Sequence, residues 1–91
     1  PIKDTYRTGP EMSDVTKRLV DFIVEETGMS AGEFDHATPL FSEGYIDSFT
    51  MTAIIAFIEA GFGIMVPQSE VTLENFDTVD NMAAFIQRQG G

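Results

Sequence analysis

The stretch LFSEGYIDSFTMTAIIAFIEA, residues 40–60, contains the features that decide the fold. Its second part, from about Ser48 to Ala60, has the periodicity of an amphipathic helix. At about 100° per residue its large apolar side chains gather on one face. That face consists of Met51, Ile54, Ile55, Ile58 and Phe62. Gly61 and Gly63 follow, and we expect them to end the helix.

The residues before this helix, 28–46, are predicted to form a long connection. Glycine and proline interrupt it repeatedly, at Gly28, Gly32, Pro39 and Gly44. A connection of this length without regular structure is uncommon in a compact domain and is often functional. Three of its apolar residues are expected to be buried, namely Leu40, Phe41 and Ile46.

Two further helices are predicted on either side. The first spans about 14–27, with Ser13 as its N-cap and Gly28 as its stop. Its inner face repeats at helical spacing through Val15, Leu19, Phe22 and Ile23. The last helix spans about 79–88, with Thr78 as its N-cap. Its inner face consists of Val79, Met82, Ala83, Phe85 and Ile86.

A second connection, containing Pro67, precedes the last helix. It is predicted to hold a short helical turn at 72–76 capped by Thr72, and to bury Ile64, Val66, Val71 and Leu73. No segment alternates with a period of two for long enough to indicate a strand. The sequence therefore predicts an all-α, four-helix bundle with three longer helices and a short third one. This domain would occupy residues 13–91, after a flexible lead-in at residues 1–12.

Composition limits the possible functions. The chain has 91 residues, 43% of them hydrophobic, which suits one small globular domain. Its net charge is −10, and no lysine or arginine occurs between Leu19 and Gln87. This argues against sequence-independent binding to nucleic acid or to anionic membranes. No apolar run approaches the roughly 20 residues of a membrane span. We therefore expect a soluble, cytoplasmic protein. We also expect a monomer, because no large apolar patch is evident outside the helix faces.

Residues that could support catalysis are few. The chain contains no cysteine, which excludes a disulfide, a thiolate metal site and a cysteine nucleophile. Its one histidine, His36, lies in the long connection and has no second histidine to form a metal pair. Asp77 and Asp80 do not follow calcium-loop spacing. The sequence predicts no metal site and no catalytic activity of its own.

The stretch at residues 40–49 resembles the acyl carrier and peptidyl carrier protein family. That family is marked by an Asp-Ser-Leu-like tripeptide at the start of its second helix. The resemblance implies that Ser48 is the attachment serine for 4′-phosphopantetheine, taken from coenzyme A by a separate phosphopantetheinyl transferase. It also implies that Asp47 assists the modification, while Phe49 stands where leucine is usual. The flanks FGIMVP and ENFDTV extend the resemblance over about residues 13–88.

The resemblance implies a discrete acyl carrier protein. Such a protein holds biosynthetic intermediates as thioesters, here in a specialised polyketide or fatty-acyl pathway. Its partners would be the transferase and the acyl- or aminoacyl-loading and condensing enzymes. The alternative within the family is an aminoacyl or peptidyl carrier of a nonribosomal pathway. The alternative outside it is an unmodified acidic interaction module, in which Ser48 is an ordinary helix cap.

The helix that begins at Ser48 also supplies candidates for partner binding and for a cargo pocket. Glu59 is its only acid after Asp47, so docking should depend mainly on apolar contact. The candidate partner-binding residues are Phe49, Thr52, Ala53, Ala56 and Glu59. The apolar face is first of all core, and it could line an acyl pocket if the bundle opens. Those candidates are Met51, Ile54, Ile55, Ile58 and Phe62.

Overall fold

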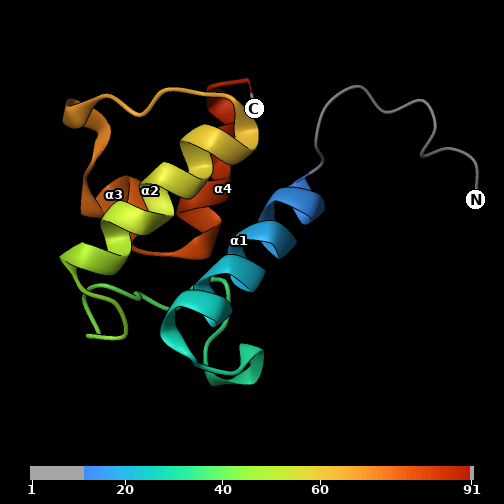
Figure 1. The fold of residues 1–91 in the computed structure, drawn as a ribbon, viewed down its shortest axis with the longest axis vertical. Coiled ribbons are helices and arrows are strands. Elements are labelled where there is room, and N and C mark those ends of the chain that lie inside the picture. Colours follow the sequence, from blue (N-terminus) through green and yellow to red (C-terminus); the bar gives the residue numbers. More distant parts are fainter. Residues whose placement is uncertain (1–11, 91) are drawn as a thin grey trace, which may run out of the picture.

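The computed structural model describes residues 12–90, and this part of the chain is helical (Figure 1). No strand occurs within those residues, which confirms the all-α prediction. None of the described helices has both the length and the apolar character needed to cross a membrane. The elements are the α-helices α1 (Met12–Thr27), α2 (Ser48–Phe62), α3 (Leu73–Phe76) and α4 (Val79–Arg88), with the short 3₁₀ helices η2 (Ala31–Glu33) and η3 (Gln68–Glu70).

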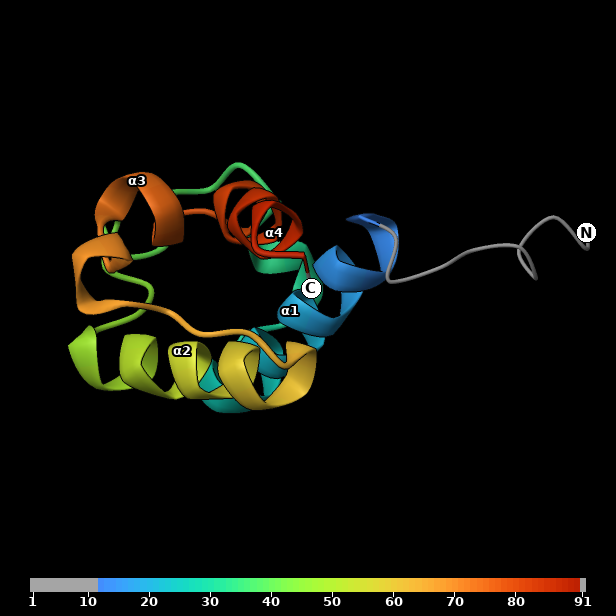
Figure 2. The same ribbon diagram turned by 90° about the horizontal axis from the view of Figure 1, so that it is seen from above.

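The helices surround one apolar core. Seen from above, α3 and α4 lie on one side and α2 on the other, while α1 lies at the end opposite α3 (Figure 2). Helix α1 packs against both α4 and α2, and α3 packs against α4. All five residues predicted for the inner face of α4 are buried, as are Val15, Leu19 and Ile23 of α1. In α2 the buried residues are Met51, Ile54 and Ile58, with Ile55 and Phe62 partly buried against them.

The helix ends follow from the residues that flank them. Thr72 and Thr78 cap α3 and α4 with their side chains, as predicted. Gly63 ends α2 in the left-handed conformation, with φ of 68°, and its N–H donates to Glu59 O. Only glycine adopts such a conformation without strain, so this position sets where α2 stops. Gly28 ends α1 in the same way, with φ of 78°.

Several predictions about helix ends and burial are wrong. Helix α1 begins at Met12, so Ser13 lies inside it, and Gly61 lies inside α2. Three apolar residues predicted to be buried are exposed, by 37% for Phe41, 39% for Val71 and 53% for Leu73. Helix α3 is a single turn that buries only Phe76, which leaves the neighbouring apolar side chains outside the core. The predicted lead-in lies outside the described residues, apart from Met12.

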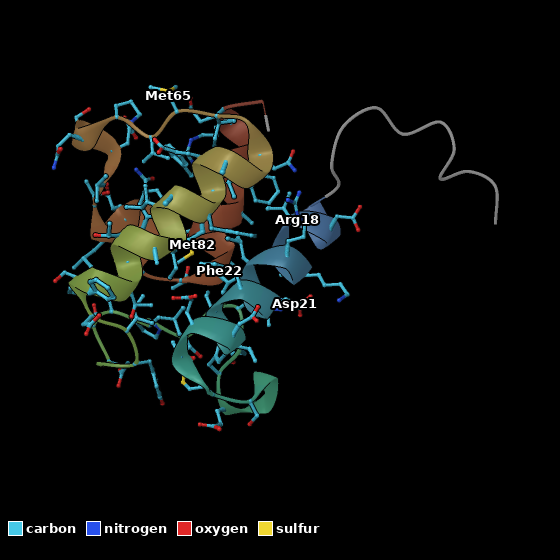
Figure 3. All side chains as sticks on the ribbon, viewed as in Figure 1. Arg18, Asp21, Phe22, Met65 and Met82 are labelled. Carbon is cyan, nitrogen blue, oxygen red and sulfur yellow. The ribbon has the colours of Figure 1, made fainter. Side chains whose placement is uncertain are left out.

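A contact between α1 and α2 fixes the C-terminal end of α2. The rings of Phe22 and Phe57 stack with centroids 4.3 Å apart, and Phe57 meets Phe62 edge to face at 6.1 Å. The Arg18 guanidinium lies 4.1 Å from the Phe62 ring centroid and donates to Gly61 O at 3.0 Å. Arg18 and Phe22 both project from α1 (Figure 3). This contact lies at the opposite end of α2 from Ser48.

Candidate functional site

Ser48 is the first residue of α2 and is exposed. Among residues 12–90, no side chain or backbone group forms a hydrogen bond with its hydroxyl. The hydroxyl of Thr52, one turn further on, donates to Ser48 O at 2.9 Å and steadies the first turn. The Ser48 hydroxyl is therefore held at a helix N-terminus, where backbone N–H groups favour an anionic group.

Asp47 orients this first turn. Its backbone is extended, and its Oδ1 accepts a hydrogen bond from Thr50 N at 2.9 Å, which makes it the N-cap of α2. The backbone N–H of Thr50, followed by the Thr50 side chain, lowers the pKa of Asp47 below its ordinary value. Asp47 is thus an ionised cap beside Ser48. Its predicted part in the modification reaction stays a prediction.

An apolar groove opens beside Ser48, between α2 and the segment around α3. Its volume is about 290 Å³. No charged side chain lines it, and its residues are Phe41, Ser48, Met51, Thr52, Ile55, Val71, Thr72, Leu73 and Phe76. Three of the exposed large apolar residues, Phe41, Val71 and Leu73, are among them. The three residues wrongly predicted to be buried therefore all line this groove.

The predicted acyl-pocket residues divide into three groups. Met51 and Ile55 line the groove. Ile54 and Ile58 are fully buried in the core, and Phe62 packs under Arg18 at the other end of α2. Helical periodicity identifies which residues of α2 face inward, and it carries no information about loop residues such as Phe41. The only signal for the missed residues was that they are large and apolar in segments without a helical pattern.

The predicted partner-binding residues lie mostly on the exposed side of α2, which we call its open face. Phe49 is 83% exposed. Thr52 and Ala56 are exposed, and Ala53 is partly buried. Glu59 differs, because its Oε2 accepts a hydrogen bond from Val66 N at 3.0 Å and so ties α2 to the following loop. Since Glu59 is the only charged residue of α2, its open face is uncharged.

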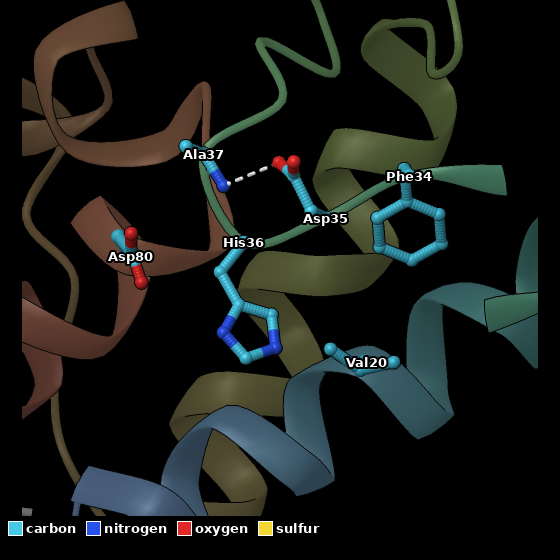
Figure 4. A pocket seen from close by; sticks show the side chains of 6 residues that line it. All are labelled: Val20, Phe34, Asp35, His36, Ala37 and Asp80. Carbon is cyan, nitrogen blue, oxygen red and sulfur yellow. Dashed lines mark hydrogen bonds between the residues drawn. The ribbon is translucent and has the colours of Figure 1, made fainter. Parts of the chain in front are cut away.

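A second cavity, of about 460 Å³, involves His36 and shares no lining residue with the groove (Figure 4). His36 is exposed. The carboxylate of Asp35 accepts from Ala37 N and from the Thr38 hydroxyl, both at 2.9 Å. The Thr38 side chain, and then the Ala37 backbone, lower the pKa of Asp35. These contacts shape a turn. No group of metal-ligating side chains occurs in the described part of the chain.

Comparison with known proteins decides the family. Residues 17–86 match the family described as "Phosphopantetheine attachment site". This chain belongs to the phosphopantetheine-binding carrier protein family. The match confirms the resemblance, and with it the carrier fold and the cofactor 4′-phosphopantetheine. Ser48, an exposed serine at a helix N-terminus beside an uncharged groove, fits the attachment of 4′-phosphopantetheine.

Individual relatives of this carrier protein have different cargoes in their names. The D-alanyl carrier protein of Lactococcus lactis subsp. lactis (strain IL1403) is 30% identical over 73 residues, 80% of this chain and 92% of its own. The acyl carrier protein of Myxococcus xanthus is 30% identical over 73 residues, covering 80% and 90%. A chain in a structure titled "Crystal structure of FAD-dependent dehydrogenase" is 32% identical, with a TM-score of 0.67, covering 75% of this chain and 97% of that one.

Proposed function

We propose that Ser48 carries the 4′-phosphopantetheine group and that this protein tethers an acyl intermediate on it as a thioester. The observation that carries the proposal is the exposed, unbonded hydroxyl of Ser48 within the family match. Other serines fit less well: the hydroxyls of Ser30 and Ser42 donate to the carboxylates of Glu33 and Asp77. The exposed Ser69 lies within the short 3₁₀ helix η3 and not at the N-terminus of an α-helix. The group supplies a terminal thiol at which acyl cargo is held.

The protein's own residues would orient and retain this group. A phosphodiester on Ser48 gains about 0.3 to 1 kcal/mol from the N-terminal end of the helix dipole. Asp47 keeps the first turn of α2 in place, because its side chain accepts the hydrogen bond from Thr50 N. In this proposal the chain performs no chemistry itself, and partner enzymes act on the thioester.

The groove supports an uncharged acyl cargo. Its lining is apolar apart from the hydroxyls of Ser48, Thr52 and Thr72. An aminoacyl cargo carries an ammonium group, and burial of that charge without a partner is costly. A carboxylate within the groove would offset this cost, and none lines it.

The similarity to D-alanyl carrier proteins favours an aminoacyl cargo as a second candidate. The two candidates differ in what they predict for the groove. An octanoyl chain on the phosphopantetheine of Ser48 should shift the Met51 methyl resonance relative to the unacylated form, whereas an alanyl group there should leave it in place. A shift with the alanyl group alone would favour the aminoacyl candidate.

Partner enzymes would dock on the uncharged face of α2, at Phe49, Thr52, Ala53 and Ala56. Exposed aromatic side chains of this kind often anchor interfaces. The transferase and the loading and condensing enzymes are the expected partners. The similarity to a chain from an FAD-dependent dehydrogenase structure adds a flavin-dependent dehydrogenase as a candidate that acts on the tethered cargo.

Intact mass spectrometry tests the attachment site. The protein is incubated with coenzyme A, Mg²⁺ and a broad-specificity phosphopantetheinyl transferase. We expect one phosphopantetheine increment on the wild type and none on Ser48→Ala. Ser69→Ala is the matched control, because Ser69 is also an exposed serine within the family match, and it should be modified like the wild type. No increment on folded wild-type protein would leave the acidic interaction module as the function.

A further inference from the structure

The groove beside Ser48 has two walls of different construction. One wall is a single helix, α2, which contributes Ser48, Met51, Thr52 and Ile55. The other wall combines α3 and the residues before it with Phe41, which belongs to the connection between α1 and α2. Because Phe41 lies far from α3 in the sequence, its place in this wall depends on a tertiary contact.

Asp77, directly after α3, supplies that contact. Its Oδ1 accepts hydrogen bonds from Phe41 N at 2.8 Å and from Ser42 N at 3.0 Å. Its Oδ2 accepts from the Ser42 hydroxyl at 2.6 Å, and its backbone oxygen accepts from Leu40 N at 2.6 Å. One residue thus binds three consecutive residues of the connection to the end of α3.

The connection itself is a compact turn. Its internal bonds run from Tyr45 N and Ile46 N to Leu40 O, and from Gly44 N to Phe41 O. Leu40 is fully buried, but the Phe41 side chain is 37% exposed and is not part of the core. Because the Phe41 ring is only partly buried, the backbone bonds to Asp77 help to hold Phe41 in the wall.

We propose that Asp77 is a positioning residue that holds Phe41 against α3 and so keeps the groove shaped for an apolar chain. Asp77 does not line the groove, so it acts through Phe41 and does not touch the cargo. The inference rests on the proposed function, because the cargo reaches the groove from Ser48. It adds the residue that controls how well the groove shields that cargo.

The test compares the chemical protection of a long and a short cargo. Octanoyl- and acetyl-phosphopantetheine are loaded on Ser48 from the corresponding acyl-coenzyme A. Cleavage of each thioester by hydroxylamine is then followed by intact mass. On the wild type we expect the octanoyl thioester to be cleaved several-fold more slowly than the acetyl thioester. Asp77→Ala should lose this difference, while the acetyl rate stays unchanged.

Two further variants separate positioning from general stability. Asp77→Asn keeps an oxygen that can accept from Phe41 N and Ser42 N, so it should retain most of the protection. Asp35→Ala is the matched control, since Asp35 also accepts bonds from a backbone N–H and a threonine hydroxyl in the same connection but does not contribute to the groove. It should protect octanoyl cargo like the wild type.

A second readout uses the unmodified protein. The Phe41 and Ser42 amide hydrogens should exchange with solvent faster in Asp77→Ala than in the wild type, because both lose their acceptor. If Asp77→Ala does not fold, Ser42→Ala removes only the hydroxyl bond and Phe41→Ala removes the ring. Both should then reduce octanoyl protection.

The outcomes are distinct. Equal protection in the wild type and in folded Asp77→Ala would overturn the inference and leave the carrier function standing. Equal rates of cleavage of the octanoyl and acetyl thioesters on the wild type would also overturn the inference without affecting the carrier function. Absence of any loading would overturn the proposed function, and the inference with it.

Discussion

Asp77 shows how one carboxylate can join two segments. Burial alone would raise the pKa of Asp77. The hydrogen bonds from the Ser42 side chain, Ser42 N and Phe41 N outweigh that effect and lower the pKa below its ordinary value. The ionised form is therefore the one that the folded protein favours, and its bonds should stabilise the fold in a pH-dependent way.

The pH dependence of stability should carry this contribution. A carboxyl group with a lowered pKa in the folded state contributes fully above its unfolded pKa, about 3.9. The contribution is lost as the pH falls through the folded-state value. Asp77→Asn should therefore lower the urea midpoint near neutral pH and lose less stability than the wild type on acidification. The measurement is the urea midpoint at a series of pH values between neutral and strongly acidic.

Ser42→Ala serves as the graded control, because it removes one of the bonds to Asp77 and keeps the carboxylate. It should lie between the wild type and Asp77→Asn. If acidification lowered the urea midpoints of the wild type and Asp77→Asn by equal amounts, this pH dependence could not be assigned to Asp77. Asp47 also has a lowered pKa, so both proteins should keep part of the acid dependence.

At the scale of helices, most of the correct predictions came from local sequence patterns. Thr72 and Thr78 cap their helices as expected because a cap depends only on neighbouring residues. Glu59, a predicted partner-binding residue, also accepts a hydrogen bond from Val66 N, since the loop after α2 turns back onto it. Its part in partner binding stays a prediction. Phe41 was predicted to be buried because it is apolar, but the wall it forms depends on Asp77. Contacts between distant segments leave no periodic pattern in the sequence, so they could not be predicted from it.

The contact between Arg18 and α2 should contribute measurably to stability. Arg18→Met keeps the apolar stem, but it removes the cation over Phe62 and the hydrogen bond to Gly61 O. We expect a loss of about 1 kcal/mol in the free energy of unfolding. Lys17→Met is the matched control, since Lys17 forms only an exposed ion pair with Asp21 in the described part of the chain. Such pairs contribute about 0 to 1 kcal/mol, and often nothing measurable. Urea denaturation that gives equal losses for both variants would contradict a special role for Arg18.

The end of α2 offers a test of backbone conformation. Gly63→Ala places a side chain at φ of 68° and should cost about 1 kcal/mol. Gly32→Ala is the control, because Gly32 is exposed, lacks a positive φ and has open space where the new methyl would lie. It should change the free energy of unfolding little. Thermal and urea denaturation of both variants measure the difference, and a neutral Gly63→Ala would show that α2 is ended by other contacts.

At the scale of the whole molecule, charge and shape separate two surfaces. The protein has a net charge of −10, yet the open face of α2 is uncharged. Long-range attraction to a basic partner would act over the acidic remainder of the surface and would weaken with salt. Apolar contact at Phe49 depends much less on salt. The dependence of partner binding on salt therefore measures the relative contributions of long-range attraction and of apolar contact at Phe49.

The Michaelis constant of the phosphopantetheinyl transferase for this protein, measured over a range of salt concentrations, separates these contributions. If apolar contact dominates, the constant should change little with salt, and Phe49→Ala should raise it several-fold at every salt concentration. Met65→Ala is the matched control, because Met65 is 77% exposed, comparable with the 83% of Phe49, but follows the C-terminal end of α2. It should leave the constant unchanged. A constant that rises steeply with salt and is indifferent to Phe49→Ala would instead assign docking to the acidic surface, and the uncharged face of α2 would then have no part in recognition by this enzyme.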